Sequence, residues 1–325
     1  AIQLPQKSDI HGATVKHFFI NKAQAKSAVK TGREFQKYLR DHYTAAELNG
    51  MCVIMYAVNP VFLVPLLKLR KKYGIKLLTI CSEVPALRRY GNSLAAKIKK
   101  RVLTYFNGQF DGYVLFSEAM THVLKMGNKP YIVLEGIAPD NMSRPETGKK
   151  NIVMYAGGLA GDNNVLKLVN CCSRMADIHE VWICGVGEDA EAIQKLAERD
   201  KRIRYFGRLP NDRVVEMEKK ARILVSIRSP KVELTKYSFP SKILEYIASG
   251  TLVLSTELGG IPAEYYSHML VTSEEESDII EAIQKGLSLS EEEYVRRCSE
   301  AQEYIQTYKN YSVQAKRIVD LTGAL

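Results

Sequence analysis

One continuous stretch, residues 235–262, decides the fold of this chain: TKYSFPSKILEYIASGTLVLSTELGGIP. Pro240 and Ser241 predict the start of a helix, because proline suits the first turn and serine suits the cap. Gly250 is expected to end that helix. Residues 252–254 then form a short, wholly apolar strand, as in parallel sheets. The helix carries an apolar stripe made of Ile243, Leu244 and Ile247.

Two charged residues suggest what this helix binds. Lys242 and Glu245 are three residues apart, so they share one side of the helix near its N-terminus. The lysine and the free backbone N–H groups at the N-terminus of this helix suit the phosphates of a sugar nucleotide, and the carboxylate suits vicinal hydroxyls. The alternative is a solvated Lys–Glu pair on an ordinary helix.

The stretch resembles the donor-site element of family 4 glycosyltransferases, which are retaining enzymes of the GT-B fold. In that family a Glu-x7-Glu motif spans this loop and helix, and its second Glu binds the donor ribose. Glu245 stands at the second position. The first Glu, which contacts the transferred sugar, is replaced by Tyr237. The YSFPSK segment and the upstream RSP resemble a bacterial branch that assembles capsule and exopolysaccharide. The resemblance implies donor contacts from Tyr237, Ser238, Phe239, Pro240, Ser241 and Glu245.

Length and composition fit a soluble protein of two domains. The chain has 325 residues, 46% hydrophobic and 25% charged, which exceeds what one core usually supports. It contains no run of about 18 apolar residues and no secretory signal. Because it begins at Ala1 rather than Met, we expect its natural N-terminus to be missing or processed. The six cysteines include no Cys-x2-Cys pair and no histidine has a partner at ligand spacing, so we expect reduced thiols and neither a zinc site nor a redox pair. The resemblance implies a reaction that needs no metal and no cofactor.

Strands and helices alternate along the whole chain, which predicts an α/β architecture with parallel sheets. The resemblance implies the GT-B plan, in which two Rossmann-like domains face each other across a cleft. We expect an acceptor-binding domain over 1–140, a donor-binding domain over 141–302 and a helix over 303–325 that returns to the first domain. Residues 138–150 are rich in Pro, Gly and polar side chains and are the expected linker.

A glycine turn follows the first strand of the second domain. Gly157, Gly158 and Gly161 do not have the Gly-x-Gly-x-x-Gly spacing, so an NAD site is disfavoured. In family 4 enzymes this turn carries an Arg and a downstream Lys for the pyrophosphate. Gly158 and Asn163 stand at those two positions, so both cations are absent.

Other cations are expected to replace them. Arg228 ends a predicted strand, and parallel strands present their carboxyl ends to the ligand crevice. Its planar guanidinium suits a diphosphate, although it could be an ordinary surface cation. Lys236 and Lys242 are the next candidates. By resemblance, Arg208 and Leu209 lie beside the nucleotide base.

The expected catalytic residues are Arg228, Lys242 and Glu83. Glu83 follows a strand of the first domain and could orient an acceptor hydroxyl, or it could be an exposed loop acid. Glu135 likewise could face the acceptor, or it could be an exposed loop acid. The loop at 259–260 is either a flexible turn at the cleft or a simple strand end.

Charge indicates the partner. The net charge is +10, and residues 88–101 carry six cations and no acid, interleaved with apolar residues. Such a basic amphipathic helix suits an anionic membrane surface. The cations are Arg88, Arg89, Lys97, Lys99, Lys100 and Arg101. Nucleic acid is the competing partner of a basic protein, but no nucleic-acid-binding motif supports it.

The predicted function is therefore transfer of a sugar from a nucleoside-diphosphate sugar to a glycan acceptor, and the resemblance implies that the transfer retains the anomeric configuration. The acceptor is expected to be lipid-linked, and the enzyme (EC 2.4 class) to act in cell-surface polysaccharide biosynthesis. We expect a cytoplasmic protein peripheral to the inner face of the membrane. Two alternatives stay open: a GT-B protein that binds nucleotide sugar without transfer, as Tyr237 and the missing cations suggest, or a nucleotide-sugar epimerase of the same fold.

Overall fold

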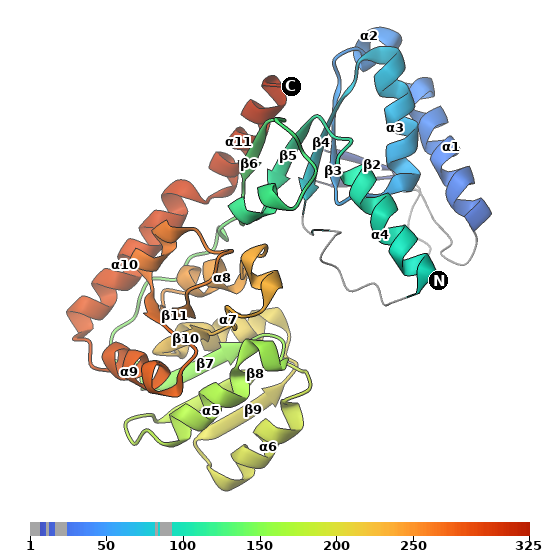
Figure 1. Cartoon of the computed structure of the whole chain (residues 1–325). Coiled ribbons are helices and arrows are strands. Elements are labelled where there is room, and N and C mark those ends of the chain that lie inside the picture. The colour runs from blue at the N-terminus through green and yellow to red at the C-terminus, as the bar shows by residue number, and fades with distance from the viewer. Residues whose placement is uncertain (1–6, 11–12, 17–24, 82–83, 85–92) are drawn as a thin grey trace. The chain divides into compact units, whose positions relative to one another are not determined.

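The computed structural model describes residues 7–10, 13–16, 25–81, 84 and 93–325 (Figure 1). The chain forms two compact units. The first consists of Ala1–Val114, Val123–Tyr131 and Leu321–Leu325, and the second of Leu115–His122 and Ile132–Asp320. The last five residues therefore cluster with the first unit, after a long passage through the second.

The first unit is built around a four-stranded sheet of order β3-β4-β5-β6, in which β3 and β4 are parallel. Asn59 caps α3, because its Oδ1 accepts from the Val61 N–H at 3.1 Å. The elements up to the strand that leads into the second unit are β1 (Lys7–Ile10), β2 (Ala13–Lys16), α1 (Ala25–His42), α2 (Ala45–Leu48), β3 (Cys52–Tyr56), α3 (Pro60–Tyr73), β4 (Lys76–Cys81), α4 (Leu94–Asn107), β5 (Gly112–Leu115), η1 (Glu118–His122), which belongs to the second unit, and β6 (Tyr131–Val133).

The second unit is a parallel sheet of order β12-β11-β10-β7-β8-β9. Its elements are β7 (Ile152–Ala156), η2 (Gly161–Asn163), α5 (Val165–Ser173), β8 (Glu180–Cys184), α6 (Ala190–Arg199), β9 (Ile203–Gly207), α7 (Asn211–Lys220), β10 (Ile223–Ser226), η3 (Glu233–Lys236), α8 (Lys242–Ala248), β11 (Leu252–Thr256), η4 (Ala263–His268), β12 (Leu270–Thr272), α9 (Glu276–Leu287), α10 (Glu291–Tyr308) and α11 (Tyr311–Gly323).

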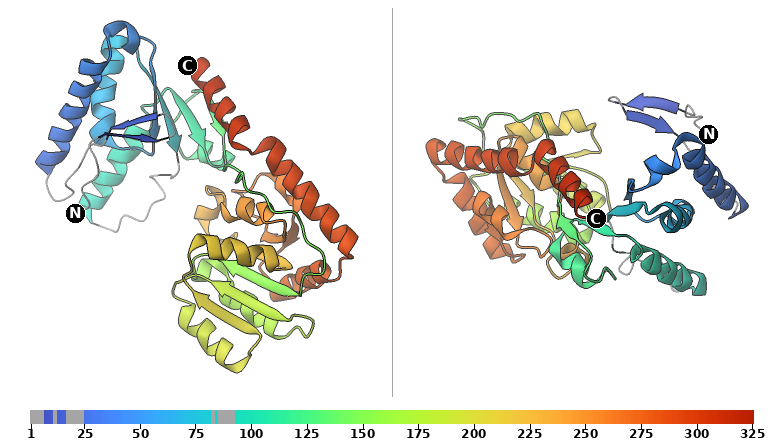
Figure 2. Two further views of the ribbon diagram at one scale, coloured as in Figure 1. Left: turned by 180° about the vertical axis from the view of Figure 1, so that it is seen from behind. Right: turned by 90° about the horizontal axis from the view of Figure 1, so that it is seen from above.

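Both faces of this sheet are buried. Successive residues of β7 alternate between two cores, with Val153 and Tyr155 in one and Met154 in the other. Figures 1 and 2, seen from opposite sides, show helices over both faces. The expected parallel α/β architecture is therefore confirmed. Strands of such a sheet are buried on both faces, which explains their continuous apolar sequences.

Residues 235–262 form the predicted helix and strand. α8 buries its expected apolar stripe, and Gly250 follows it with φ +72. A side chain at Gly250 would also place its Cβ 2.5 Å from the Ser143 carbonyl oxygen, so glycine is required there. One detail was wrong: Ser241 stands at the cap position but its side chain makes no cap hydrogen bond, because its backbone is already helical.

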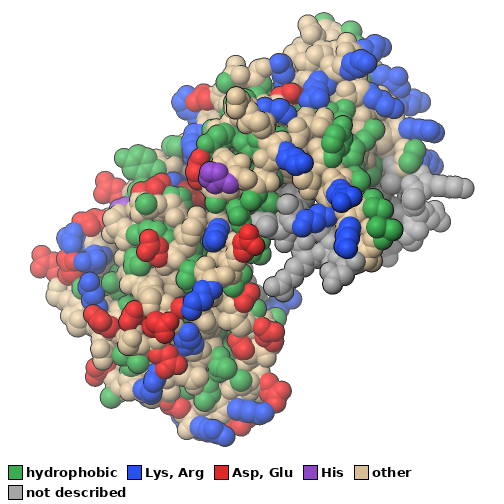
Figure 3. All heavy atoms as spheres, in the orientation of Figure 1, with side chains coloured by type: hydrophobic (Ala, Val, Ile, Leu, Met, Phe, Trp, Pro, Cys, Tyr) green, Lys and Arg blue, Asp and Glu red, His purple; other side chains and the backbone are tan. Residues whose placement is uncertain are grey.

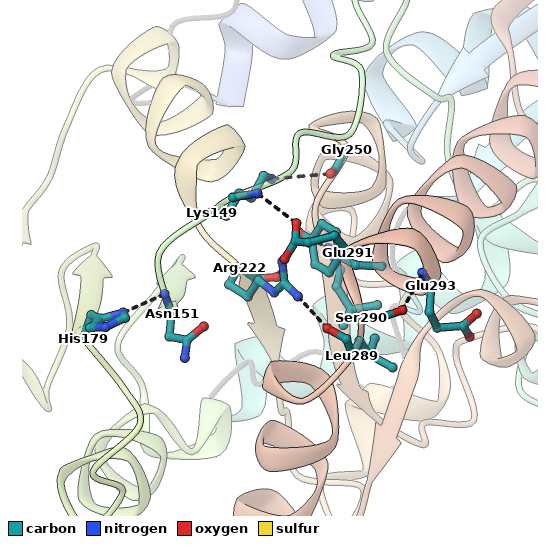
Figure 4. A network of polar contacts seen from close by, with 12 residues as sticks. Lys149, Asn151, His179, Arg222, Gly250, Leu289, Ser290, Glu291 and Glu293 are labelled. Atoms are coloured by element: carbon teal, nitrogen blue, oxygen red, sulfur yellow. Dashed lines mark hydrogen bonds and ion pairs between the residues drawn. The ribbon is translucent and has the colours of Figure 1, made fainter.

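The expected linker is bound to the second unit by the polar network in Figure 4. Gly148 N donates to Glu291 Oε2 at 2.8 Å, and Lys149 Nζ donates to Thr251 Oγ1 at 2.8 Å. Arg222, 3% exposed, donates to Glu291 Oε1 at 2.6 Å. The second unit takes in residues 132–140 as well, because Ala138 N donates to Lys309 O at 2.8 Å. The compact units thus divide the chain at residues other than the expected boundaries.

Candidate functional site

The glycine turn after β7 is held by its own neighbours. Gly157 N donates to Cys184 O at 2.9 Å. The Gly158 carbonyl accepts from Tyr155 Oη at 2.8 Å and from Asn163 Nδ2 at 2.7 Å. Asn163 therefore fixes the turn, which has a defined shape at the carboxyl end of β7.

Arg228 lies directly beside this turn. The Ser229 N–H donates to Asp162 O at 2.9 Å, and Thr256 Oγ1 donates to Arg228 O at 2.6 Å. Burial lowers the pKa of Arg228, while Tyr155 and Asp162 act in the opposite direction. The guanidinium remains charged, because an arginine does not lose its proton in proteins. The structure thus brings together a cation and a polar turn that the sequence separates by about 70 residues.

The loop before α8 packs against the Gly259–Gly260 loop. A side chain at Gly260 would place its Cβ 2.3 Å from Ser238 O and 2.5 Å from Thr235 O, so only glycine allows this approach. Phe239 is buried with its ring centroid 5.1 Å from that of Tyr265. Pro240 is buried and Tyr237 is half-buried. The loop expected at the donor sugar is therefore anchored on both sides.

Lys242 is not a free cation. Its ammonium contacts Glu245 one turn along α8 and lies 3.4 Å from Glu218 Oε1 on α7. The side chains of Lys242 and Glu245 are 31% and 26% exposed, so both reach the surface, whereas that of Glu218 is 0% exposed. The expected pair is thus a triad with a buried third member.

Glu218 was not among the predicted site residues, although its place on α7 carries a signal. Val214 on α7 and Ala221 directly after it are both buried, and position 218 lies between them at helical spacing. A glutamate on an apolar helix face requires a partner, because burying a lone carboxylate is costly.

The remaining expected residues lie elsewhere. Arg208 is exposed after β9, and Leu209 packs against the core under α8. Glu83, Arg88 and Arg89 lie outside the described residues. Glu135 is 5% exposed and accepts from Tyr265 Oη at 2.8 Å, and Lys309 also contacts it.

Within the described ranges, no group of three or more potential ligand side chains could hold a metal ion, and all six cysteines are free thiols. No helix in the described part of the chain is both long and apolar enough to cross a membrane.

One segment of the chain matches a known protein family. Residues 150–288 match the family model described as "Glycosyl transferases group 1". No curated protein matches the sequence.

The solved structures that resemble this chain include three sugar-handling proteins. Sucrose-phosphate synthase from Thermosynechococcus elongatus is 13% identical with a TM-score of 0.67, covering 98% of this chain and 85% of its own. Trehalose 6-phosphate synthase from Burkholderia multivorans is 11% identical with a TM-score of 0.64, covering 94% and 78%. HepE of Anabaena, in complex with UDP-glucose, is 11% identical with a TM-score of 0.65, covering 91% and 82%.

The fold is that of the GT-B glycosyltransferases. Within it, the segment that matches group 1 glycosyl transferases, residues 150–288, carries the glycine turn, Arg228 and the group formed by Lys242, Glu245 and Glu218.

Proposed function

We propose that this protein transfers a sugar, with retention, from a nucleoside-diphosphate sugar to a glycan acceptor. The observation that carries the proposal is the half-buried Arg228 beside the glycine turn, at the carboxyl ends of β10 and β7, within the segment that matches group 1 glycosyl transferases. A desolvated guanidinium at this edge of a parallel sheet suits the diphosphate of a nucleotide.

The donor would be held along this edge of the second unit. Arg228 pairs with the diphosphate and neutralises the charge that develops as it leaves. Glu245 accepts hydrogen bonds from the ribose hydroxyls. The loop at Arg208 and Leu209 borders the base, and the anchored loop from Tyr237 to Pro240 borders the sugar. No protein nucleophile is required, because binding and charge stabilisation supply the catalysis.

The proposed surface for the acceptor and the membrane is α4 of the first unit. Four of its apolar side chains are exposed and recur at helical spacing: Leu94 at 75%, Ile98 at 52%, Val102 at 41% and Tyr105 at 62%. Beside them a cavity of about 710 Å³ is lined by four cations: Lys97, Lys100, Arg101 and Lys125. Figure 3 shows cationic and hydrophobic side chains next to one another on this unit. Lys99 is also exposed.

This surface supports binding to an anionic membrane. A cationic helix with an exposed apolar stripe binds acidic lipid both by burying its apolar side chains and by electrostatic attraction to the headgroups. We therefore propose a protein peripheral to the cytoplasmic face of the cell membrane, with a lipid-linked acceptor in capsule or exopolysaccharide synthesis.

The first experiment is a calorimetric and thermal-shift panel of UDP, GDP, dTDP, CDP and NAD. Wild type should bind one nucleoside diphosphate, Glu245→Ala should weaken that binding, and Arg228→Ala should nearly abolish it. Arg204→Ala, an exposed arginine paired with Glu180, is the matched control and should leave binding unchanged. If wild type binds no nucleoside diphosphate, the proposed function is wrong.

A second candidate is nucleotide-sugar binding without transfer. It is favoured by Tyr237, which stands where the family carries a glutamate. Product analysis with the nucleotide sugar that binds separates the possibilities: an extended glycan supports transfer, a free epimer indicates an epimerase, and no product indicates binding alone.

A further inference from the structure

Glu218 is a fully buried carboxylate with one oxygen unaccounted for. Its Oε1 lies 3.4 Å from Lys242 Nζ, but its Oε2 is buried and has no hydrogen-bond partner. A buried, unpaired carboxylate oxygen is costly, so native proteins rarely leave one without a donor. The position therefore requires an explanation.

The nearest charges do not supply that donor. Lys242 is shared, since its ammonium also contacts the Glu245 carboxylate. Two further titratable groups face Glu218: the Cys184 thiol at the end of β8 and the Tyr246 hydroxyl on α8. Burial raises the pKa of Cys184 to about 11 and raises that of Tyr246 well above its usual value, so both are neutral. Among the described residues, no second cation pairs with Glu218.

Ionising both glutamates would therefore leave two negative charges on one lysine, with one of them wholly buried. A proton on Glu218 removes this excess charge. It also turns the carboxyl group into a donor, and Glu245 is the acceptor within reach of a side-chain hydrogen bond. Burial, reinforced by Glu245 and opposed by Lys242, raises the pKa of Glu218 to about 8.

We propose that Glu218 is a positioning residue of the nucleotide site, whose protonated carboxyl donates a hydrogen bond to Glu245 and, together with Lys242, orients the Glu245 carboxylate toward the ribose of the ligand. This inference rests on the proposed function, in which Glu245 binds that ribose. Glu218 has no exposed surface and acts only through its neighbours.

The arrangement links ribose recognition to pH. Above about pH 8 Glu218 loses its proton, the hydrogen bond to Glu245 is lost, and a second negative charge draws Lys242 away. The phosphate of the ligand completes its own titration near about pH 6, so its charge is constant in this range. The preference for ribose over 2′-deoxyribose should therefore fall as the pH rises.

The test titrates UDP, GDP and CDP, each against its 2′-deoxy form, by calorimetry at about pH 7 and about pH 9. In wild type the ribose preference should fall roughly tenfold between these values, the size of one hydrogen bond to a charged group. Glu218→Gln keeps a donor at every pH, so its preference should stay constant. Glu216→Gln, on the exposed side of the same helix, should behave as wild type.

The outcomes separate the two proposals. A wild-type preference that is independent of pH, or a Glu218→Gln variant that retains the wild-type decline, overturns the role of Glu218 while nucleotide binding stands. No binding of any of these nucleotides by wild type overturns both. Infrared spectroscopy of wild type gives a readout that does not need the variant to fold: the carbonyl band of a protonated carboxyl should be present at about pH 7 and lost by about pH 9, and its absence at the lower pH overturns the inference.

Discussion

Lys309 and Glu135 form an ion pair that is almost wholly buried, with 9% and 2% of their side chains exposed. Tyr265 completes the group, since its hydroxyl donates to Glu135 Oε1 at 2.8 Å and its ring lies 5.1 Å below the lysine ammonium. Glu135 follows β6 and Lys309 follows α10, so the pair joins two distant segments of the second unit.

Replacing one partner of this pair should be strongly destabilising. Lys309→Met leaves the Glu135 carboxylate buried without a cation, and we expect a loss of about 3–5 kcal/mol in the free energy of unfolding, measured by urea denaturation. Adding Glu135→Gln should recover part of that loss. Lys316→Met, which breaks an exposed pair with Asp320, should cost less than about 1 kcal/mol. Equal losses in the free energy of unfolding for Lys309→Met and Lys316→Met would contradict the burial of the Lys309–Glu135 pair.

Adjacent glycines should respond differently to alanine. At Gly260 an added Cβ would lie 2.3 Å from the Ser238 carbonyl oxygen, whereas at Gly259 the nearest atom is 3.5 Å away. Gly260→Ala must displace the loop before α8, so we expect a lower melting temperature and nucleotide affinity reduced by roughly tenfold or more. Gly259→Ala should leave both near wild type. A Gly260→Ala variant with wild-type affinity would show that this loop does not contact the nucleotide.

Glu291 should stabilise the second unit in a pH-dependent way. The Gly148 N–H first, and Arg222 in addition, lower the pKa of Glu291. A lowered pKa means that the stabilisation is present above the unfolded-state pKa of about 4.3 and is lost as the pH falls through the folded value. Glu291→Gln should therefore melt earlier than wild type at about pH 7, and the difference should shrink as the pH falls below about 4. A constant difference would contradict this assignment.

Removing charge from α4 should weaken membrane binding. A variant with Lys97, Lys100 and Arg101 changed to Gln should sediment less with vesicles that contain acidic lipid, by about 1 kcal/mol for each cation. Wild-type binding should also fall at high salt. The control changes Lys195, Arg199 and Lys201, which are exposed on and after α6, and removes the same charge. Equal losses in the two triple variants, or no wild-type binding at low salt, would exclude a membrane site on α4.

Local patterns predicted the elements of this protein well. The helix and strand after Pro240, the stop at Gly250 and the parallel sheet all follow from short-range spacing, and the structure contains them. These features are set by apolar periodicity and by glycine, which act within one or two turns of chain.

Contacts between distant segments were not predictable in the same way. Lys242 was expected either to bind phosphate or to pair with Glu245 alone, because its other partner, Glu218, lies on another helix. The segment before β7 looked like a linker because its composition is polar, yet Lys149 and Gly148 bond to residues far along the chain. Pairing across the fold depends on tertiary packing, which the local pattern of a sequence does not reveal.

The division of the chain also limits how this protein can be dissected. It passes between the two units at 114/115, 122/123, 131/132 and 320/321, so neither unit is one continuous segment. Ser117 lies in residues 115–122, the first segment of the second unit. Its hydroxyl donates at 3.1 Å to the carbonyl of Lys236, beside the loop that precedes α8. A truncation or a chimaera joined near residue 140 would separate the second unit from this piece. Recombination with a relative should therefore keep residues 115–122 and 132–320 from the same parent.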